Sequence, residues 1–170
     1  MRPLYMNCLQ HNRKPGSSVG FFTNIWKRLT FLLTFDLLFI TPMNCLFVDD
    51  DIDDQEIFAF ALQELDKSVS LVTAGNGIEA LEMLKADKTF IPDCIFLDLN
   101  MPRMNGKECL PEIRKLAWLK DVPIFIYTTS SEEKDRLDAK MLGATDFMVK
   151  ESSLDRLKRS LNDLFHRHKI

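Results

Sequence analysis

The alternation of hydrophobic runs from Met43 onward constrains the fold more than any other feature of this sequence. Short apolar runs alternate with longer stretches in which apolar residues recur at helical spacing. Strands that alternate with helices form a parallel sheet with helices on both faces. The sequence therefore predicts an α/β domain, a doubly wound five-stranded parallel sheet. The predicted strands are 44–48, 69–73, 93–97, 123–127 and 145–149, each followed by a helix, with Asp53 and Ser131 capping the first and fourth helices.

The composition excludes several classes of protein. A hydrophobic content of 46% and a charged content of 28% are typical of a globular chain. The net charge of −3 shows no excess of basic residues of the kind that binds nucleic acid, so we expect no nucleic-acid partner. The four cysteines form no CxxC pair and the three histidines lie near the chain ends, which excludes a zinc or histidine-based centre in the domain body. Cys45 and Cys94 are expected to be buried reduced thiols, which favours a cytoplasmic location.

Residues 1–42 differ in character from the rest of the chain. They hold five basic residues and one acid, a net charge of +4, whereas 43–170 hold 17 basic and 24 acidic residues, a net charge of −7. The apolar run 29–41 is shorter than the roughly 20 residues of a spanning helix and contains Asp36, so membrane association is not expected. A cleaved signal, an interfacial helix and a genuine N-terminal extension remain open. The favoured hypothesis is an over-extended gene start, because Met43 leads directly into the first strand.

Polar side chains follow four of the five predicted strands. Asp49 and Asp50 follow the first strand, Asp98 the third, Thr128 the fourth and Lys150 the fifth. Because parallel strands end at the same edge of a sheet, where such folds bind ligands, we expect these groups to lie together.

This set of groups suits one kind of chemistry. Two carboxylates about 4 Å apart repel by about 4 kcal/mol at an effective dielectric constant near 20, so the acids need a cation. Oxygen ligands with retained water are what Mg²⁺ prefers. Lys150 adds a second positive charge and Thr128 adds a hydroxyl donor. A carboxylate in these surroundings can accept a phosphoryl group, because the charge on the phosphoryl oxygens is neutralised.

Five segments carry a family resemblance: LFVDDD, NGIEALEML, IFLDLNMPRMNG, VPIFIYTTSS and GATDFMVK. Through them, residues 43–170 resemble the receiver domain of bacterial two-component response regulators, especially stand-alone regulators of the chemotaxis and phytochrome kinds. The resemblance implies a flavodoxin-like (βα)5 fold with strand order 2-1-3-4-5. It also implies that Asp98 is the phosphoacceptor. Asp50, Asp98 and the backbone carbonyl of Asn100 would bind Mg²⁺, with Asp49 acting through metal-bound water.

The resemblance extends to a conformational switch, with two departures from the family pattern. Thr128 would hydrogen-bond the phosphoryl group, Lys150 would pair with Asp98 or its phosphoryl, and Phe147 occupies the aromatic switch position. Phe147 lacks a tyrosine hydroxyl, so its switching would depend on packing alone. Glu151 replaces the usual proline after the lysine, which puts the shape of that loop in question.

The functional expectation is a single-domain response regulator of a phosphorelay. The resemblance implies a sensor histidine kinase or histidine phosphotransfer protein as donor. It implies a downstream protein target on the face of the fourth helix, fifth strand and fifth helix, and it leaves homodimerisation open. We expect no catalysis beyond the regulator's own phosphorylation and dephosphorylation. Two alternatives remain: a small Mg²⁺-dependent aspartyl-phosphate phosphohydrolase, and an interaction module that works without phosphorylation.

Overall fold

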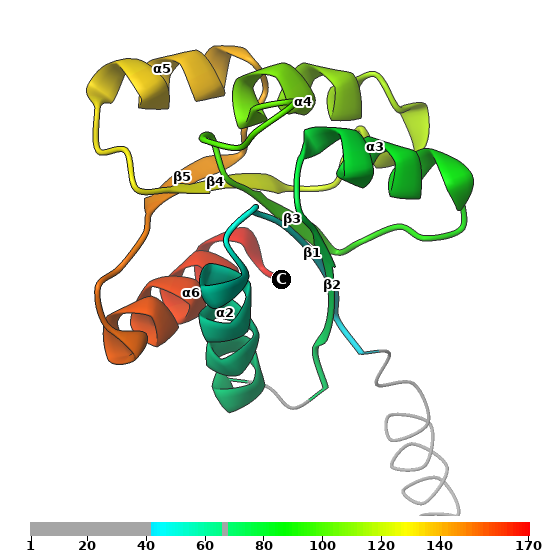
Figure 1. The fold of residues 1–170 in the computed structure, drawn as a ribbon. Helices are drawn as coiled ribbons and strands as arrows, with labels where there is room; N and C mark the ends of the chain where they lie inside the picture. The colour runs from blue at the N-terminus through cyan, green and yellow to red at the C-terminus, as the bar shows by residue number, and fades with distance from the viewer. Residues whose placement is uncertain (1–41, 66–67) are drawn as a thin grey trace, which may run out of the picture. The chain divides into compact units, whose positions relative to one another are not determined.

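The computed structural model describes residues 42–65 and 68–170, so the hypothesis about residues 1–42 lies outside the described residues except at Pro42. Five parallel strands form one sheet in the order β2-β1-β3-β4-β5 (Figure 1). The strands are β1 Asn44–Val48, β2 Ser70–Ala74, β3 Cys94–Leu97, β4 Ile124–Thr128 and β5 Asp146–Val149. The predicted strands, their parallel pairing and their order are confirmed, with ends that agree to within one residue.

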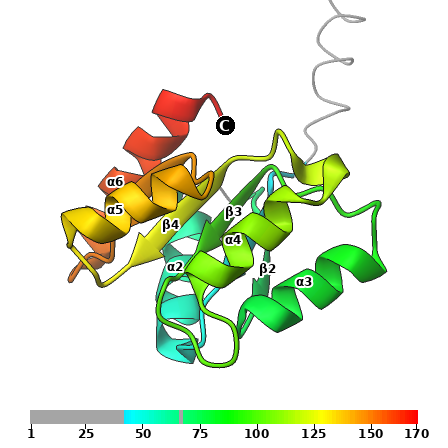
Figure 2. The same ribbon diagram turned by 90° about the horizontal axis from the view of Figure 1, so that it is seen from above.

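Helices cover both faces of this sheet. Figure 1 places α2 and α6 on one face and α3, α4 and α5 on the other, and Figure 2 shows these last three following one another across their face. The helices are α2 Ile52–Leu65, α3 Gly77–Ala86, α4 Gly106–Arg114, α5 Glu133–Met141 and α6 Leu154–His168, with a 3-10 turn, η1, at Ala117–Leu119. Across the described residues, none of the helices has the length and hydropathy needed to cross a bilayer.

The two helical layers enclose two separate hydrophobic cores. Leu46 and Val48 belong to the core under α3, α4 and α5, whereas Cys45 and Phe47 belong to the core under α2 and α6. Phe47 stacks on Phe58 of α2 with ring centroids 4.2 Å apart. Because successive side chains point to opposite faces and both faces are buried, the strand reads as one continuous apolar run.

The two cysteines predicted to be buried thiols lie side by side on neighbouring strands. Cys45 of β1 and Cys94 of β3 are in register, both fully buried, with their Sγ atoms 3.7 Å apart. Both are free thiols, and burial raises the pKa of Cys45 well above its ordinary value. The prediction of buried reduced thiols is confirmed, and the raised pKa keeps the Cys45 thiol protonated.

The predicted N-cap of the first helix is wrong. Helix α2 begins at Ile52, so Asp53 lies inside its first turn. Asp51 is the capping residue, because its Oδ1 accepts hydrogen bonds from the backbone N–H of Asp53 at 2.9 Å and of Asp54 at 3.4 Å. Several aspartates in the run DDDIDD can cap a helix, and the run itself does not determine which of them precedes the first turn.

The predicted cap of the fourth helix is wrong as well. Helix α5 begins at Glu133, and its N-cap residue Glu132 makes no side-chain capping hydrogen bond. The side chain that accepts a backbone N–H here belongs to Ser130 and not to Ser131. Its hydroxyl oxygen accepts a hydrogen bond from the N–H of Glu132 at 3.3 Å. The helix starts one residue later than a cap at Ser131 would place it.

Candidate functional site

The backbone of the sheet fixes the residues that follow its strands. Asp49 donates its N–H to the carbonyl of Ala74 at 3.0 Å, and Asp98 donates to Val48 at 2.9 Å. Lys150 donates to Thr128 at 2.7 Å. These bonds continue the ladders of the sheet beyond the strand ends, so Asp49, Asp98 and Lys150 are each held by a neighbouring strand. We call the edge where the strands end the carboxyl edge; the residues at it are Asp49, Asp50, Asp98, Thr128 and Lys150.

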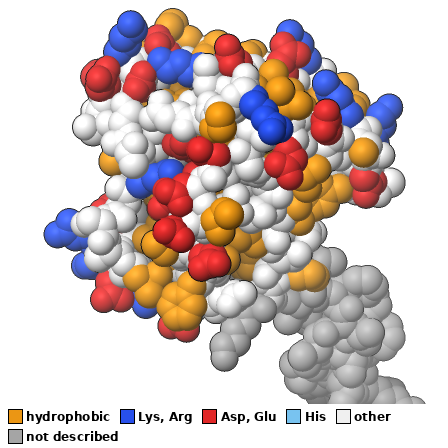
Figure 3. Space-filling model, in the orientation of Figure 1, with side chains coloured by type: hydrophobic (Ala, Val, Ile, Leu, Met, Phe, Trp, Pro, Cys, Tyr) orange, Lys and Arg blue, Asp and Glu red, His pale blue; other side chains and the backbone are white. Residues whose placement is uncertain are grey.

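The predicted charged groups of the carboxyl edge do come together. Ligand oxygens of Asp49, Asp50 and Asp98 all lie within 4.8 Å of one another. Lys150 Nζ lies 2.7 Å from Asp49 Oδ2 and 3.9 Å from Asp98 Oδ1. Acidic side chains gather in the middle of the face shown in Figure 3, between the two helical layers. The strand-end pattern therefore correctly predicted a cluster of acids beside one ammonium group.

Burial makes the electrostatics of this cluster strong. The side chains of Asp49 and Asp98 are 1% and 5% exposed, whereas Asp50 is exposed. Burial raises the pKa of Asp49 above its usual value, although contact with Lys150 and a backbone hydrogen bond from Asp51 oppose the shift. Burial by itself would lower the pKa of Lys150, but its contacts with Asp49 and Asp54 leave that pKa raised. Lys150 is therefore a permanent cation at neutral pH.

One oxygen of Asp98 tests whether these residues fit a metal ion. Asp98 Oδ2 accepts a hydrogen bond from the backbone N–H of Asn100 at 3.0 Å. Asp98 Oδ1 is buried and has no hydrogen-bond partner among the described residues. A buried acceptor without a partner is costly, and two further carboxylates nearby increase the cost. A hard cation held by oxygen ligands removes both costs, so the residues fit Mg²⁺.

The loop after Asp98 brings helix α4 against the carboxyl edge. The Asn105 side chain caps α4 by accepting a hydrogen bond from the backbone N–H of Glu108. The Glu108 carboxylate in turn accepts a hydrogen bond from the backbone N–H of Asn105. Gly106 N–H donates to the carbonyl of Leu99 at 3.1 Å. A Cβ at Gly106 would lie only 2.2 Å from the carbonyl oxygen of Asp98, so this position requires glycine. The NMPRMNG segment thus fixes the backbone on which Asp98 sits.

Thr128 connects the carboxyl edge to α5. It is fully buried, and its Oγ1 accepts from the backbone N–H of Ser130 at 3.4 Å. Ser130 in turn hydrogen-bonds Asp135 of α5, and Asp135 pairs with Lys107 at 2.8 Å. This bond uses the hydroxyl oxygen of Thr128 as an acceptor and does not engage its proton.

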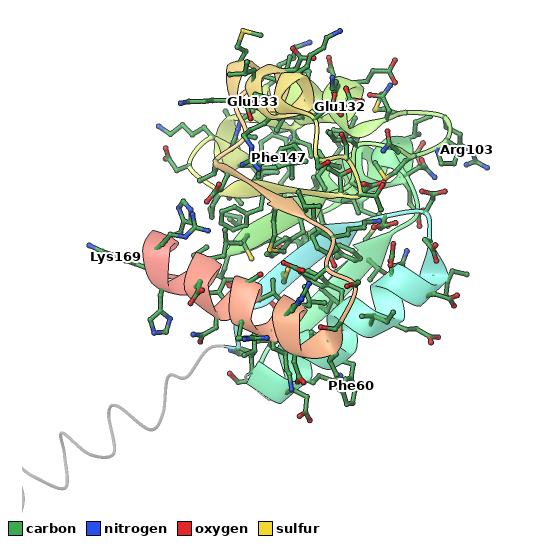
Figure 4. All side chains as sticks on the ribbon, turned by 90° about the vertical axis from the view of Figure 1, so that its left-hand side faces the viewer. Phe60, Arg103, Glu132, Glu133, Phe147 and Lys169 are labelled. Carbon is green, nitrogen blue, oxygen red and sulfur yellow. The ribbon has the colours of Figure 1, made fainter. Side chains whose placement is uncertain are left out.

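Phe147 and Glu151 lie where the sequence pattern places them, on β5 and in the loop after it. Phe147, labelled in Figure 4, is half-buried. The Arg136 guanidinium lies 4.6 Å from its ring centroid. Glu151 Oε1 accepts a hydrogen bond from Ser160 Oγ of α6 at 3.3 Å, which ties the loop to that helix without a proline.

Sequence reasoning missed the contact of Asp54 with the predicted site. Asp54 is not among the predicted site residues, yet its Oδ2 lies 2.7 Å from Lys150 Nζ. The two residues are 96 positions apart. The signal that could have revealed the contact is the phase of α2: a helix that starts at Ile52 places position 54 in the turn nearest the carboxyl edge.

Comparison with known sequences identifies the domain. The family model for the response regulator receiver domain matches residues 45–162. The sensor histidine kinase CheAY of Helicobacter pylori is 37% identical over 106 residues, which are 62% of this chain and 13% of that protein. Response regulator MprA of Mycobacterium leprae is 34% identical over 127 residues, 75% of this chain and 53% of that protein. The chain thus spans about half or less of the length of these curated relatives.

Solved structures agree with the sequence match. The phosphorylated cyanobacterial phytochrome response regulator RcpA is 28% identical with a TM-score of 0.66, covering 72% of this chain and 91% of that chain. The chemotaxis response regulator CheY4 of Vibrio cholerae is 32% identical with a TM-score of 0.63, covering 73% and 99%. The Mn²⁺-bound form of response regulator Rcp1 is 27% identical with a TM-score of 0.62, covering 73% and 92%. With its fold, its acidic carboxyl edge and these relatives, the chain belongs to the response regulator receiver domain family.

Proposed function

We propose that this receiver accepts a phosphoryl group on Asp98, with Mg²⁺, from a sensor histidine kinase or a histidine phosphotransfer protein. The observation that carries the proposal is the buried Oδ1 of Asp98, which has no hydrogen-bond partner among the described residues although the Lys150 ammonium lies 3.9 Å away. An oxygen in this position is free to act as ligand and nucleophile. Residues 43–170 form the receiver unit, and a cytoplasmic location suits the free thiols and the kinase partner.

The chemistry follows from the groups present. A lone pair on one Asp98 oxygen forms the new bond to phosphorus, the nitrogen–phosphorus bond of a phosphohistidine breaks, and its electron pair leaves with the imidazole. Asp50, Asp98 and the Asn100 carbonyl would hold Mg²⁺, and Asp49 would act through bound water. The ion would supply positive charge against the phosphoryl oxygens. Lys150 supplies the second positive charge. Attack of water on phosphorus breaks its bond to the Asp98 oxygen, releases inorganic phosphate and regenerates the carboxylate. The domain would thus catalyse its own phosphorylation and dephosphorylation and no other reaction.

Thr128 and Phe147 would convert the modification into a signal. The Thr128 hydroxyl proton can donate to a phosphoryl oxygen, which would draw the end of β4 and the Ser130 turn inward. Phe147 could then turn into the space released beside β5. A phosphoryl group shifts such an equilibrium only by its differential affinity for the two states. The readout would be the face formed by α5, β5 and α6, offered to a downstream protein or to a second copy of the chain.

Intact-mass measurement after incubation with acetyl phosphate and Mg²⁺ tests the proposal. The parent should gain the mass of one phosphoryl group, and the Asp98→Asn variant should gain none. A gain that persists in Asp98→Asn would place the modification elsewhere. An unmodified parent would favour an interaction module that works without phosphorylation, and steady turnover of a phosphate ester would favour a phosphohydrolase.

A further inference from the structure

Lys150 Nζ lies among three carboxylates at unequal distances. It is 2.7 Å from Asp49 Oδ2, 2.7 Å from Asp54 Oδ2 and 3.9 Å from Asp98 Oδ1. The last distance is too long for a hydrogen bond. The lysine side chain is 10% exposed and its backbone N–H is bound to Thr128, so its position is defined at both ends. The ammonium is therefore placed nearer to Asp54 than to Asp98.

Asp54 is itself held firmly. It lies in the first turn of α2, and its backbone N–H donates to the capping carboxylate of Asp51 at 3.4 Å. A negative charge in the first turn of a helix is favourable, because the helix dipole is positive there. The Asp54 side chain is 32% exposed, so its charge keeps part of its hydration. Asp54 is thus a fixed, charged acceptor for the lysine.

Asp54 and Asp98 compete for the Lys150 ammonium, and the outcome determines whether Asp98 Oδ1 is available to a ligand. If Lys150 were bound directly to Asp98 Oδ1, the ammonium would compete with a metal ion for that oxygen and reduce its availability as a nucleophile. We propose that Asp54 is a positioning residue that holds Lys150 off Asp98, leaving Oδ1 available to Mg²⁺ and to the incoming phosphorus. This inference rests on the function proposed above for Asp98.

The chain offers a matched control for the charge of Asp54. Asp53 lies one residue earlier in the same turn, is exposed, and its carboxylate makes no ion pair within the described part of the chain. Asp53→Asn and Asp54→Asn therefore make the same change of net charge, and only the second removes a contact with Lys150. When the Asp54 charge is removed, Lys150 keeps its contact with Asp49. The ammonium N–H that bonded Asp54 is then expected to turn toward Asp98.

Mg²⁺ affinity, measured by calorimetry without any phosphoryl donor, is the first readout. We expect Asp54→Asn to bind Mg²⁺ about fivefold more weakly than Asp53→Asn, the size expected for one partly exposed ion pair. The rate of phosphorylation by acetyl phosphate should fall by a similar factor. Equal Mg²⁺ affinities in the two variants would overturn the inference.

A double-mutant cycle with Lys150→Met separates positioning from a direct effect of the Asp54 charge. In the Lys150→Met background, Asp54→Asn and Asp53→Asn should have equal Mg²⁺ affinities, because the ammonium through which Asp54 acts is gone. A difference that survives there would overturn the inference. Failure of acetyl phosphate to modify the parent would refute the proposed function but leave this metal-binding cycle valid. A parent that binds no Mg²⁺ would refute both.

Discussion

At the edge of the sheet where the strands begin, polar side chains bond to backbone groups, whereas at the carboxyl edge three carboxylates and an ammonium group also lie close to one another. Asp93 accepts the backbone N–H of Asn44 at 2.7 Å, and Thr145 accepts that of Ile124 at 3.0 Å. At the carboxyl edge, Asp98 Oδ1 has no hydrogen-bond partner among the described residues. We call the edge where the strands begin the amino edge. Its polar side chains satisfy backbone groups of the fold.

Arg114 shows most clearly how the amino edge is built. Its guanidinium donates to the carbonyl of Val122 at 2.7 Å and to the carbonyl of Gly143 at 2.9 Å. These carbonyls lie in the segments that lead into β4 and β5. Burial lowers the pKa of Arg114, yet the guanidinium remains charged at any ordinary pH. One side chain thus satisfies the backbone of two loops, whereas the carboxyl edge retains an acceptor that the fold leaves unused.

The largest effect in this comparison is expected from Gly106→Ala at the carboxyl edge. The new Cβ would lie 2.2 Å from the carbonyl oxygen of Asp98, so the backbone of one of them must move. We expect a loss of about 3 kcal/mol in the free energy of unfolding, at the upper end for overpacking. Urea denaturation of parent and variant measures this loss.

Gly75→Ala is the matched control for that variant. A Cβ there would meet only the flexible end of Glu79, with Oε2 at 3.3 Å, so we expect a change of less than about 1 kcal/mol. Equal stability of Gly106→Ala and the parent would show that the carboxyl edge tolerates movement of the Asp98 backbone.

A smaller loss is expected at the amino edge from Arg114→Met. This change keeps an unbranched apolar side chain but removes the hydrogen bonds to Val122 and Gly143. At about 1 kcal/mol for each net hydrogen bond, the free energy of unfolding should fall by about 2 kcal/mol. Arg156→Met, on an exposed position of α6, should change it by less than about 0.5 kcal/mol. Similar unfolding midpoints for the two variants would refute the role given to Arg114.

Much of the fold was predictable because it depends on local patterns. Buried strands require continuous apolar runs, and the five runs identified all five strands. The helix starts were less predictable, since each of several neighbouring polar residues can act as a cap. In DDDIDD the capping residue proved to be Asp51 rather than Asp53, and before α5 no side chain of the N-cap residue takes this role.

The site was predictable to the extent that strand ends determine it. Asp49, Asp98, Thr128 and Lys150 are each fixed by a strand, and parallel strands bring their ends to one edge. Asp54 is fixed by the phase of a helix, and its contact with Lys150 depends on how α2 packs against the sheet. The phase of the helix brings Asp54 to the carboxyl edge, but the choice of Lys150 as its partner joins residues 96 positions apart and has no local pattern.

The stability of Asp98→Asn with and without Mg²⁺ tests most directly whether the carboxyl edge is reserved for a ligand. Asparagine can still accept the Asn100 N–H, but it removes one of three neighbouring carboxylates. Without metal, the variant should be at least as stable as the parent and up to about 1 kcal/mol more stable. Millimolar Mg²⁺ should raise the unfolding temperature of the parent alone, because only the parent retains the full set of ligands. A variant that is less stable than the parent without metal, and that gains as much from Mg²⁺, would contradict the account.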